Sequence, residues 1–144
     1  MNFENLLDDK KIEKVATEIP DFESCEKSLN SAKRNFKEDD FDWASTIAYS
    51  SVLKAGIKLM GFYGYRAIGK EHHKNVFEFL KELKLDLNLT NFFNKIRIKR
   101  NEFLYRDAFS VSKEEAKEII LNAENFVHKI RTFVRKNKTG RNEN

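Results

Sequence analysis

Most hydrophobic positions of the chain recur at the three- and four-residue spacing that amphipathic helices require. From Asp21 onward this stripe is clean, and Asp21 itself stands where an N-cap residue is expected. Its apolar members are Phe22, Cys25, Leu29, Ala32 and Phe36. The next helix is predicted from about Asp40 to Tyr63, with apolar or small residues on most of its faces. Such a helix is normally the most enclosed helix of a bundle.

The pattern is shorter or interrupted around these two helices. Residues 1–20 predict an N-terminal helical extension, made of a short helix and a second one that Pro20 ends. Their apolar positions are Phe3, Leu6 and Leu7, then Ile12, Val15, Ala16 and Ile19. Residues 61–69 hold three of the five glycines and predict a structured loop. A third bundle helix is expected to start near His72, and a fourth is expected from Leu89 to Arg106.

The last helix begins with a capping box, in which Ser112 is the N-cap and Glu115 stands at the third helical position. Its inward positions are predicted to be Ala116, Ile119, Ile120, Ala123, Val127, Ile130 and Val134. Residues 137–144 read as a basic flexible tail. Because no strand alternation is visible, the fold class predicted for residues 21–136 is all-α, an antiparallel up-and-down bundle of four to five helices.

Composition limits the class of protein further. The chain has 144 residues, of which 40% are apolar and 35% charged, so we expect one soluble domain with its own core. Neither a membrane span nor a signal peptide is predicted, because no long apolar run occurs and the first residues lack the basic-then-apolar order. The single cysteine, Cys25, lies on an apolar stripe; we expect a core residue and a reducing cytoplasmic setting.

The sequence contains neither a standard metal-binding motif nor a nucleotide-binding loop. His72, His73 and His128 have no partner at a zinc-binding spacing, and adjacent helical residues point about 100° apart, so neither a metal nor another cofactor is predicted. The glycines of residues 61–69 do not form a P-loop, although Tyr65 and Arg66 could stack on a base or pair with phosphate. The net charge of +4 is compatible with a nucleic-acid partner.

One cation stands where a hydrophobe belongs. On the helix predicted from Leu89 to Arg106, Arg100 falls near the middle of the apolar stripe, with Asn101 and Tyr105 beside it. A charge in an apolar seam is costly unless it is paired, so Arg100 should lie at an interface, beside a ligand or in a salt bridge. Lys95, Arg97, Lys99 and Arg106 crowd the same helix. The second basic cluster is interpreted as a solvated helix end: Arg131, Arg135, Lys136, Lys138 and Arg141.

The order of these features resembles a HEPN domain, the higher-eukaryote and prokaryote nucleotide-binding family. The resemblance is carried by Arg100-Asn101 late in the penultimate long helix and by the capped helix that Ser112 opens after a polar break. Upstream, Asp42-Trp43-Ala44 opens the central helix. Gly64-Tyr65-Arg66 and Glu71-His72-His73 follow that helix. The resemblance covers roughly Asp21 to Arg135.

Membership would imply a homodimer in which the arginine-containing helices of two protomers meet around a shared cleft. Many members are metal-independent endoribonucleases with an arginine followed, after four to six residues, by a histidine. Prokaryotic members are often encoded beside a minimal nucleotidyltransferase, in toxin–antitoxin or defence modules. By this analogy the catalytic positions would be Arg100 and Tyr105. RNA or a nucleotide would contact Arg97, Arg100, Asn101, Tyr105, Arg106, Tyr65 and Arg66.

The chain departs from the family motif at the histidine. The positions where histidine is expected hold Tyr105, Arg106 and Asp107. Tyrosine, with a pKa near 10, is a poor general base at neutral pH, whereas Arg100 and Asn101 could still bind phosphate and ribose.

Three hypotheses follow. The first is a module whose dimer cleft binds RNA, a nucleotide or a nucleotidyltransferase. The second is an active ribonuclease in which Tyr105, His72 or His73 fills the missing role. The third is a structural bundle in which Arg100 pairs with a buried carboxylate such as Asp42.

Overall fold

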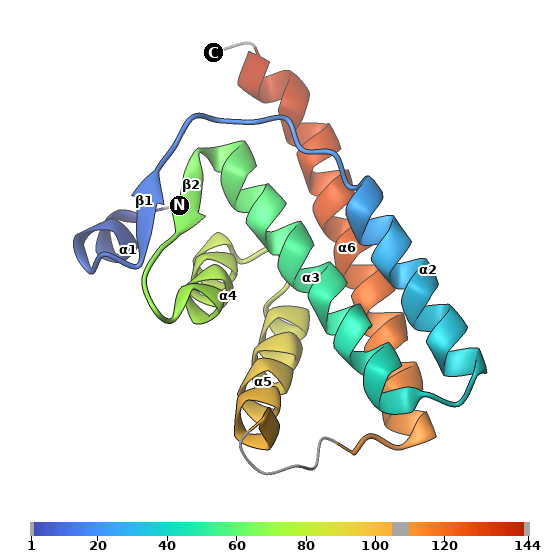
Figure 1. Ribbon diagram of the computed structural model, residues 1–144. Helices are drawn as coiled ribbons and strands as arrows, with labels where there is room; N and C mark the ends of the chain where they lie inside the picture. The colour runs from blue at the N-terminus through green and yellow to red at the C-terminus, as the bar shows by residue number, and fades with distance from the viewer. Residues whose placement is uncertain (1, 105–109, 143–144) are drawn as a thin grey trace.

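The computed structural model describes residues 2–104 and 110–142, without the side chains of 102–104 and 139–142 (Figure 1). The described residues form α1 (Glu4–Asp8), β1 (Ile12–Lys14), α2 (Glu23–Lys37), α3 (Phe41–Tyr63), β2 (Tyr65–Ala67), α4 (His72–Leu83), α5 (Leu87–Leu104) and α6 (Lys113–Asn142). The helices form a bundle, so the predicted all-α class is confirmed.

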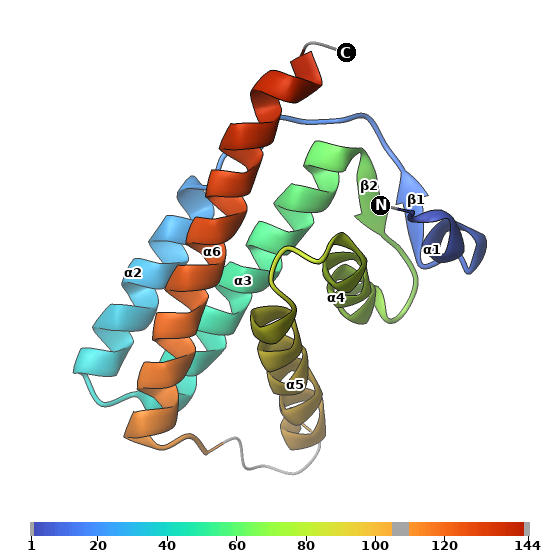
Figure 2. The ribbon, with the colours of Figure 1, turned by 180° about the vertical axis from the view of Figure 1, so that it is seen from behind.

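Helix α3 is the centre of the bundle. It packs against α2 and α6 on one side and against α4 and α5 on the other, as both views show (Figures 1 and 2). Burial follows the prediction of an enclosed helix, because Ala44, Ala48, Val52, Ala55 and Leu59 have no exposed surface. The predicted inward positions of the last helix are all buried as well, together with Phe126.

Side chains accept N–H groups at the starts of α2, α3 and α6. The Asp40 carboxylate accepts the Trp43 N–H (3.3 Å) at the start of α3. The N-cap of α2 is Phe22, one residue after the predicted Asp21, although the Asp21 carboxylate accepts the Glu23 N–H (2.9 Å). At the start of α6 the Ser112 hydroxyl accepts the Glu115 N–H (3.1 Å) and lies 3.2 Å from the Glu115 carboxylate. Helix α6 continues to Asn142, through the segment expected as a tail.

The second helix predicted within residues 1–20 is wrong. In its place β1 pairs with β2 as an antiparallel ladder in which Ile12 faces Ala67 and Lys14 faces Tyr65. Ile12 is buried whereas Ile19 is 57% exposed, so the apolar residues of this segment do not share one helical face. A strand of three residues is too short to reveal alternation in the sequence, which explains the error.

The loop predicted over residues 61–69 is also wrong in part. Helix α3 continues through Gly61 to Tyr63 and ends at Gly64, whose φ of 85° is the left-handed conformation of a helix C-cap. The next three residues form β2, which α1 and β1 cover at one end of the molecule.

Two further observations bear on the class of protein. Cys25 is a free, fully buried thiol, as expected of a core residue. None of the described helices is long and apolar enough to cross a membrane.

Candidate functional site

Helix α5 places Arg100 at the edge of the core. Leu89, Phe93 and Ile96 are buried along the side of α5 that faces the bundle, and Arg100 is the next member of that stripe. The Arg100 side chain is half-buried, whereas Asn101 and Lys99 on either side of it are exposed. The cation is therefore held against the protein by the packing of the helix that carries it.

An aromatic ring, not a carboxylate, faces the Arg100 guanidinium. Its central carbon lies 4.6 Å from the centroid of the Tyr49 ring, a cation–π contact with a residue of α3 that is 2% exposed. Burial raises the pKa of the Tyr49 phenol to about 12, although the cations of Arg100 and Arg97 oppose that shift. The phenol is therefore neutral at physiological pH, and its ring presents its face to the arginine.

The buried ion pair of the third hypothesis is not formed among the described side chains. Asp42, the carboxylate considered for it, accepts the Val111 N–H at 2.7 Å and so joins the start of α3 to the segment before α6. No ion pair of the described residues includes Arg100.

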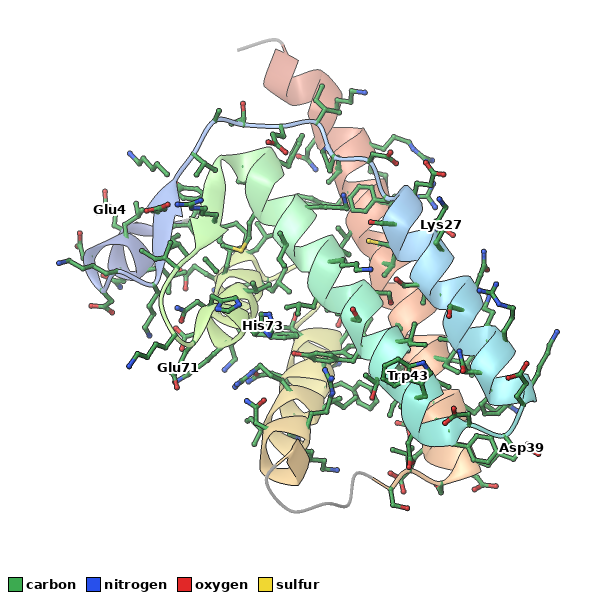
Figure 3. The ribbon with its side chains drawn as sticks, viewed as in Figure 1. Glu4, Lys27, Asp39, Trp43, Glu71 and His73 are labelled. Atoms are coloured by element: carbon green, nitrogen blue, oxygen red, sulfur yellow. The ribbon has the colours of Figure 1, made fainter. Side chains whose placement is uncertain are left out.

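A small polar cavity of about 170 Å³ opens between the start of α4 and the second half of α5. It is lined by Lys70, Glu71, His72, His73, Lys74, Arg97 and Asn101. Glu71 and His73 mark the α4 side of this cavity in Figure 3. The single carboxylate of the lining, Glu71, lies 3.6 Å from the Lys74 ammonium. The cavity is therefore cationic, and we call it the α4–α5 cavity.

The two histidines of the α4–α5 cavity contact each other. Their ring centroids are 4.4 Å apart, and Nδ1 of His72 lies 3.2 Å from the Gly69 carbonyl oxygen. Burial lowers the pKa of His73, and His72, Arg100 and Arg97 lower it further. The imidazole of His73 is consequently neutral at pH 7 and able to accept a proton.

Chain geometry explains why residues far apart in sequence meet at this cavity. Helices α4 and α5 are joined by a short link, so the start of α4 lies at the same level as the second half of α5. The 12 residues of α4 cover about 18 Å, and Arg100 lies about 20 Å along α5, at 1.5 Å per residue. The second hypothesis names His72 and His73 as substitutes for the missing histidine, and this spacing along the two helices favours them.

The other residues predicted for the site lie elsewhere or outside the described residues. Arg97 is in the cavity wall, where its Nε donates to the Asn94 side chain (2.9 Å). Tyr65 lies on β2 with its ring 5.3 Å from that of Phe3, and Arg66 pairs with Glu13 of β1. Neither Tyr65 nor Arg66 lines the α4–α5 cavity. Tyr105 and Arg106 lie outside the described residues.

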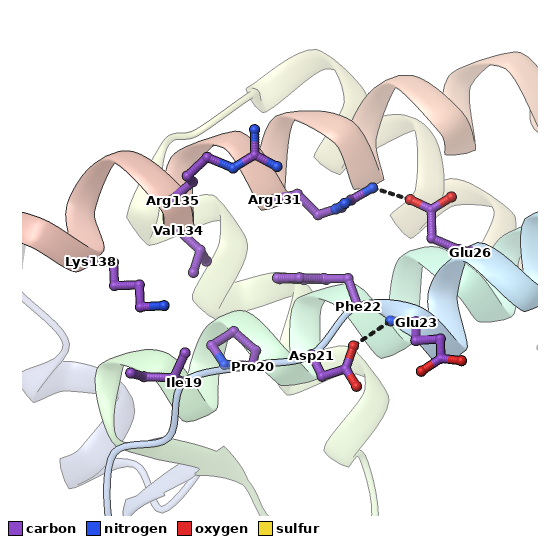
Figure 4. Close-up of a pocket in the computed structure, with 10 residues that line it drawn as sticks. All are labelled: Ile19, Pro20, Asp21, Phe22, Glu23, Glu26, Arg131, Val134, Arg135 and Lys138. Atoms are coloured by element: carbon purple, nitrogen blue, oxygen red, sulfur yellow. Dashed lines mark hydrogen bonds and ion pairs between the residues drawn. The ribbon is translucent and has the colours of Figure 1, made fainter.

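A larger cavity of about 370 Å³ lies between the segment that enters α2 and the last turns of α6 (Figure 4). Three of its charged groups already have partners, because Arg131 pairs with Glu26 and Asp21 accepts the Glu23 N–H. Arg135 and Lys138 also line it, and both are exposed, as the interpretation of a solvated helix end expects. Over the described ranges no group of three or more His, Cys, Asp or Glu residues could hold a metal ion.

The fold and the site define a helical bundle whose penultimate long helix carries a half-buried arginine, Arg100, and lines a cationic cavity with the neighbouring Asn101 and with Arg97. The sequence profile of the HEPN domain matches residues 22–133, which include α2, α3, α4, α5 and most of α6. The chain therefore belongs to the HEPN domain family, and the resemblance found in the sequence is confirmed. Neither the curated proteins nor the solved structures give a match.

Proposed function

We propose that this HEPN domain binds RNA through a surface centred on Arg100. The observation that carries the proposal is the cation–π contact between Arg100 and Tyr49. A carboxylate partner would occupy the N–H donors of the guanidinium, whereas a ring face holds the cation and occupies none of them. Among the described side chains, the donors of Arg100 thus remain available for a phosphodiester.

The neighbouring residues favour an anionic ligand. Arg97 has its Nε held by Asn94, which leaves its terminal nitrogens to face the α4–α5 cavity. Lys70 adds an ammonium group from the loop before α4, and Asn101 adds an amide that can bind ribose or base. Guanidinium groups match phosphate oxygens in two-pronged hydrogen bonds, so two of them on one helix suit a nucleic-acid backbone.

The binding unit we propose is a homodimer, in which the family resemblance expects the helices that carry Arg100 to meet around a shared cleft. Leu87 and Ile98 are 45% and 44% exposed on α5, and their spacing of three helical turns puts them on one face. Asn101 follows on the same side of the helix. At 100° per residue this face lies roughly opposite Arg100 on the helix, and large apolar side chains exposed on one face are typical of an interface. A nucleotidyltransferase partner and a role in a toxin–antitoxin or defence module remain expectations of the family resemblance.

RNA binding to three variants tests the proposal. Fluorescence anisotropy with a labelled single-stranded RNA should show that Arg100→Ala weakens binding by about 10- to 100-fold, the worth of a hydrogen bond to a charged group. Arg100→Lys should recover only part of the affinity, because an ammonium lacks the planar fork. Lys99→Ala is the matched control, since Lys99 is the exposed neighbour on the same helix.

Light scattering of the same samples measures the molar mass and thereby the oligomeric state. Equal binding by wild type and Arg100→Ala, with a monomeric mass at tens of micromolar protein, would contradict the proposal.

Metal-independent RNA cleavage is the second candidate function. It is favoured by the neutral imidazole of His73 in the same cavity as Arg97. Incubation of RNA with wild type and Arg100→Ala in excess EDTA should then give fragments with the wild type alone. Intact RNA after long incubation at high protein concentration would rule this candidate out.

A further inference from the structure

The volume of the α4–α5 cavity limits what can enter it. Binding sites for whole small molecules usually enclose about 300–1,000 Å³. At about 170 Å³ this cavity is too small for a complete nucleotide, yet it has room for one phosphate group and part of the attached ribose. An RNA strand bound at Arg100 would therefore place a backbone linkage there and keep its bases outside.

We propose that His73 is the catalytic base of metal-independent RNA cleavage at this cavity, and that it takes the proton of a ribose 2′-hydroxyl. This inference rests on the proposed RNA-binding function. Its basis is the position of the imidazole, which lines the same cavity as Arg97 and Asn101 although it comes from a different helix. The role of the expected histidine, for which the sequence offers Tyr105, a poor base at neutral pH, would be taken by a residue of α4.

The surroundings of His73 keep its imidazole neutral. The charged and titratable groups that face it are Lys70 before α4; Glu71, His72 and Lys74 at the start of α4; and Arg97 and Arg100 on α5. Cations predominate in this set, and Glu71 is engaged by Lys74. Positive neighbours and partial burial both lower the pKa of His73 below its ordinary 6.5, so the base is free of its proton at pH 7.

The reaction balances without a metal ion or an oxidant. His73 accepts the proton of the 2′-hydroxyl while the 2′-oxygen forms a bond to the adjacent phosphorus and the bond from phosphorus to the 5′-oxygen breaks. That 5′-oxygen takes a proton from solvent water, and the hydroxide so formed removes the proton from His73. The products are a 2′,3′-cyclic phosphate and a 5′-hydroxyl, with Arg97 and Arg100 beside the charged phosphate.

His72 acts as a positioning residue. The contact of Nδ1 of His72 with the Gly69 carbonyl holds the ring in place. Because a carbonyl can only accept a hydrogen bond, Nδ1 carries the proton in this contact. Its ring then packs edge-to-face against that of His73 at 4.4 Å and contributes to the lowered pKa of His73. Loss of His72 should therefore change the pH at which His73 works.

Three histidine variants test the inference in EDTA with a 5′-labelled single-stranded RNA. His73→Gln should lower the cleavage rate by about 100-fold or more, as expected when a general base is removed. Binding is measured separately with the matching 2′-deoxy strand, which lacks the nucleophile, and should change less than threefold. His128→Gln is the control, because His128 is exposed on α6 and does not line the cavity.

The pH dependence of the cleavage rate distinguishes a catalytic base from a residue with a purely structural role. Wild-type cleavage should rise with pH, with the midpoint of the rise below pH 6.5, as His73 loses its proton. In His72→Gln the rise should move to higher pH, because one group that lowers the pKa of His73 is gone. The 3′ end of the first fragment should carry the cyclic phosphate.

The outcomes separate the two proposals. A strong rate loss in His73→Gln with binding retained supports the inference. Wild type that binds the 2′-deoxy strand without cutting RNA overturns it and leaves the RNA-binding function standing. Cleavage that persists in His73→Gln overturns it as well. A wild type that neither binds nor cuts overturns both proposals.

Discussion

Arg100 of α5 and Tyr49 of α3 are joined by a cation–π contact of 4.6 Å, and no carboxylate of the described side chains takes part. The contact explains how a cation can occupy an apolar stripe at low cost, because the ring face compensates part of the desolvation. It also fixes the guanidinium beside the α4–α5 cavity. The contact between Arg100 and Tyr49 thus belongs both to the packing of the bundle and to the surface proposed to bind RNA.

Alkaline unfolding should reveal the buried phenol of Tyr49. Its folded pKa of about 12 is above the ordinary 10, so the neutral ring stabilises the fold below pH 10 and that contribution is lost between pH 10 and 12. The loss should reach about 2–3 kcal/mol. Urea denaturation from pH 8 to 12 should show that Tyr49→Phe, which keeps the ring face, lacks this part of the decline. Identical pH slopes for the two proteins would contradict the assignment.

Two glycines of α3 should respond in opposite ways to alanine. A Cβ at Gly56 would lie 2.9 Å from Cγ1 of Val76 and 3.2 Å from Cδ1 of Leu80, where α4 crosses α3. Gly56→Ala should therefore lower the free energy of unfolding by about 1–3 kcal/mol, as overpacking does. Gly61 has nothing within 4 Å of such a Cβ, so Gly61→Ala should raise it by up to about 1 kcal/mol. Thermal and urea denaturation of both variants measure the difference.

The long elements could be predicted because their signals are local. The start of α3 is specified by Asp40, whose carboxylate accepts an N–H three residues later, and the start of α6 by Ser112 with Glu115. The pattern predicts the end of α3 at Tyr63 but not the C-cap role of Gly64, since a left-handed C-cap and a loop glycine look alike in sequence.

Residues that depend on pairing over long distances could not be placed in the same way. Ile12 is buried by its ladder with Ala67, a partner that no local pattern reveals. For the site, Arg100 stood out because it interrupted a helical stripe, whereas Tyr49 was one more member of a central helix. The sequence does not reveal that α4 and α5 bring His73 and Arg97 to one cavity.

The capping box of α6 should be worth a measurable part of the stability. Ser112→Ala removes the acceptor of the Glu115 N–H and should lower the free energy of unfolding by about 1 kcal/mol. Ser110→Ala, two residues earlier at an exposed position, is the control and should change it by less than about 0.5 kcal/mol. Urea denaturation at pH 7 measures both, and equal effects would mean that the box adds nothing.

Protonation of Asp86 should lower the free energy of unfolding of the bundle at acidic pH. Its carboxylate accepts the Leu89 N–H at 2.9 Å at the start of α5 and pairs with Lys129 of α6. Partial burial alone would raise the pKa of Asp86, but N–H groups of Leu89 and Asn88 and the Lys129 ammonium outweigh it and hold the pKa below its ordinary 3.8. The charged carboxylate therefore stabilises the fold above pH 4, and this contribution is lost as the pH falls below that value.

Two substitutions at Asp86 separate the cap from the charge. Asp86→Asn keeps a side-chain oxygen for the Leu89 N–H and loses the pair with Lys129, so it should be less stable than wild type at pH 7 and equal to it near pH 2. Asp86→Ala also loses the cap and should cost about 1 kcal/mol more than Asp86→Asn at pH 7. Urea denaturation across this pH range gives the comparison. A constant difference between Asp86→Asn and wild type at every pH would show that the ion pair does not stabilise the folded chain.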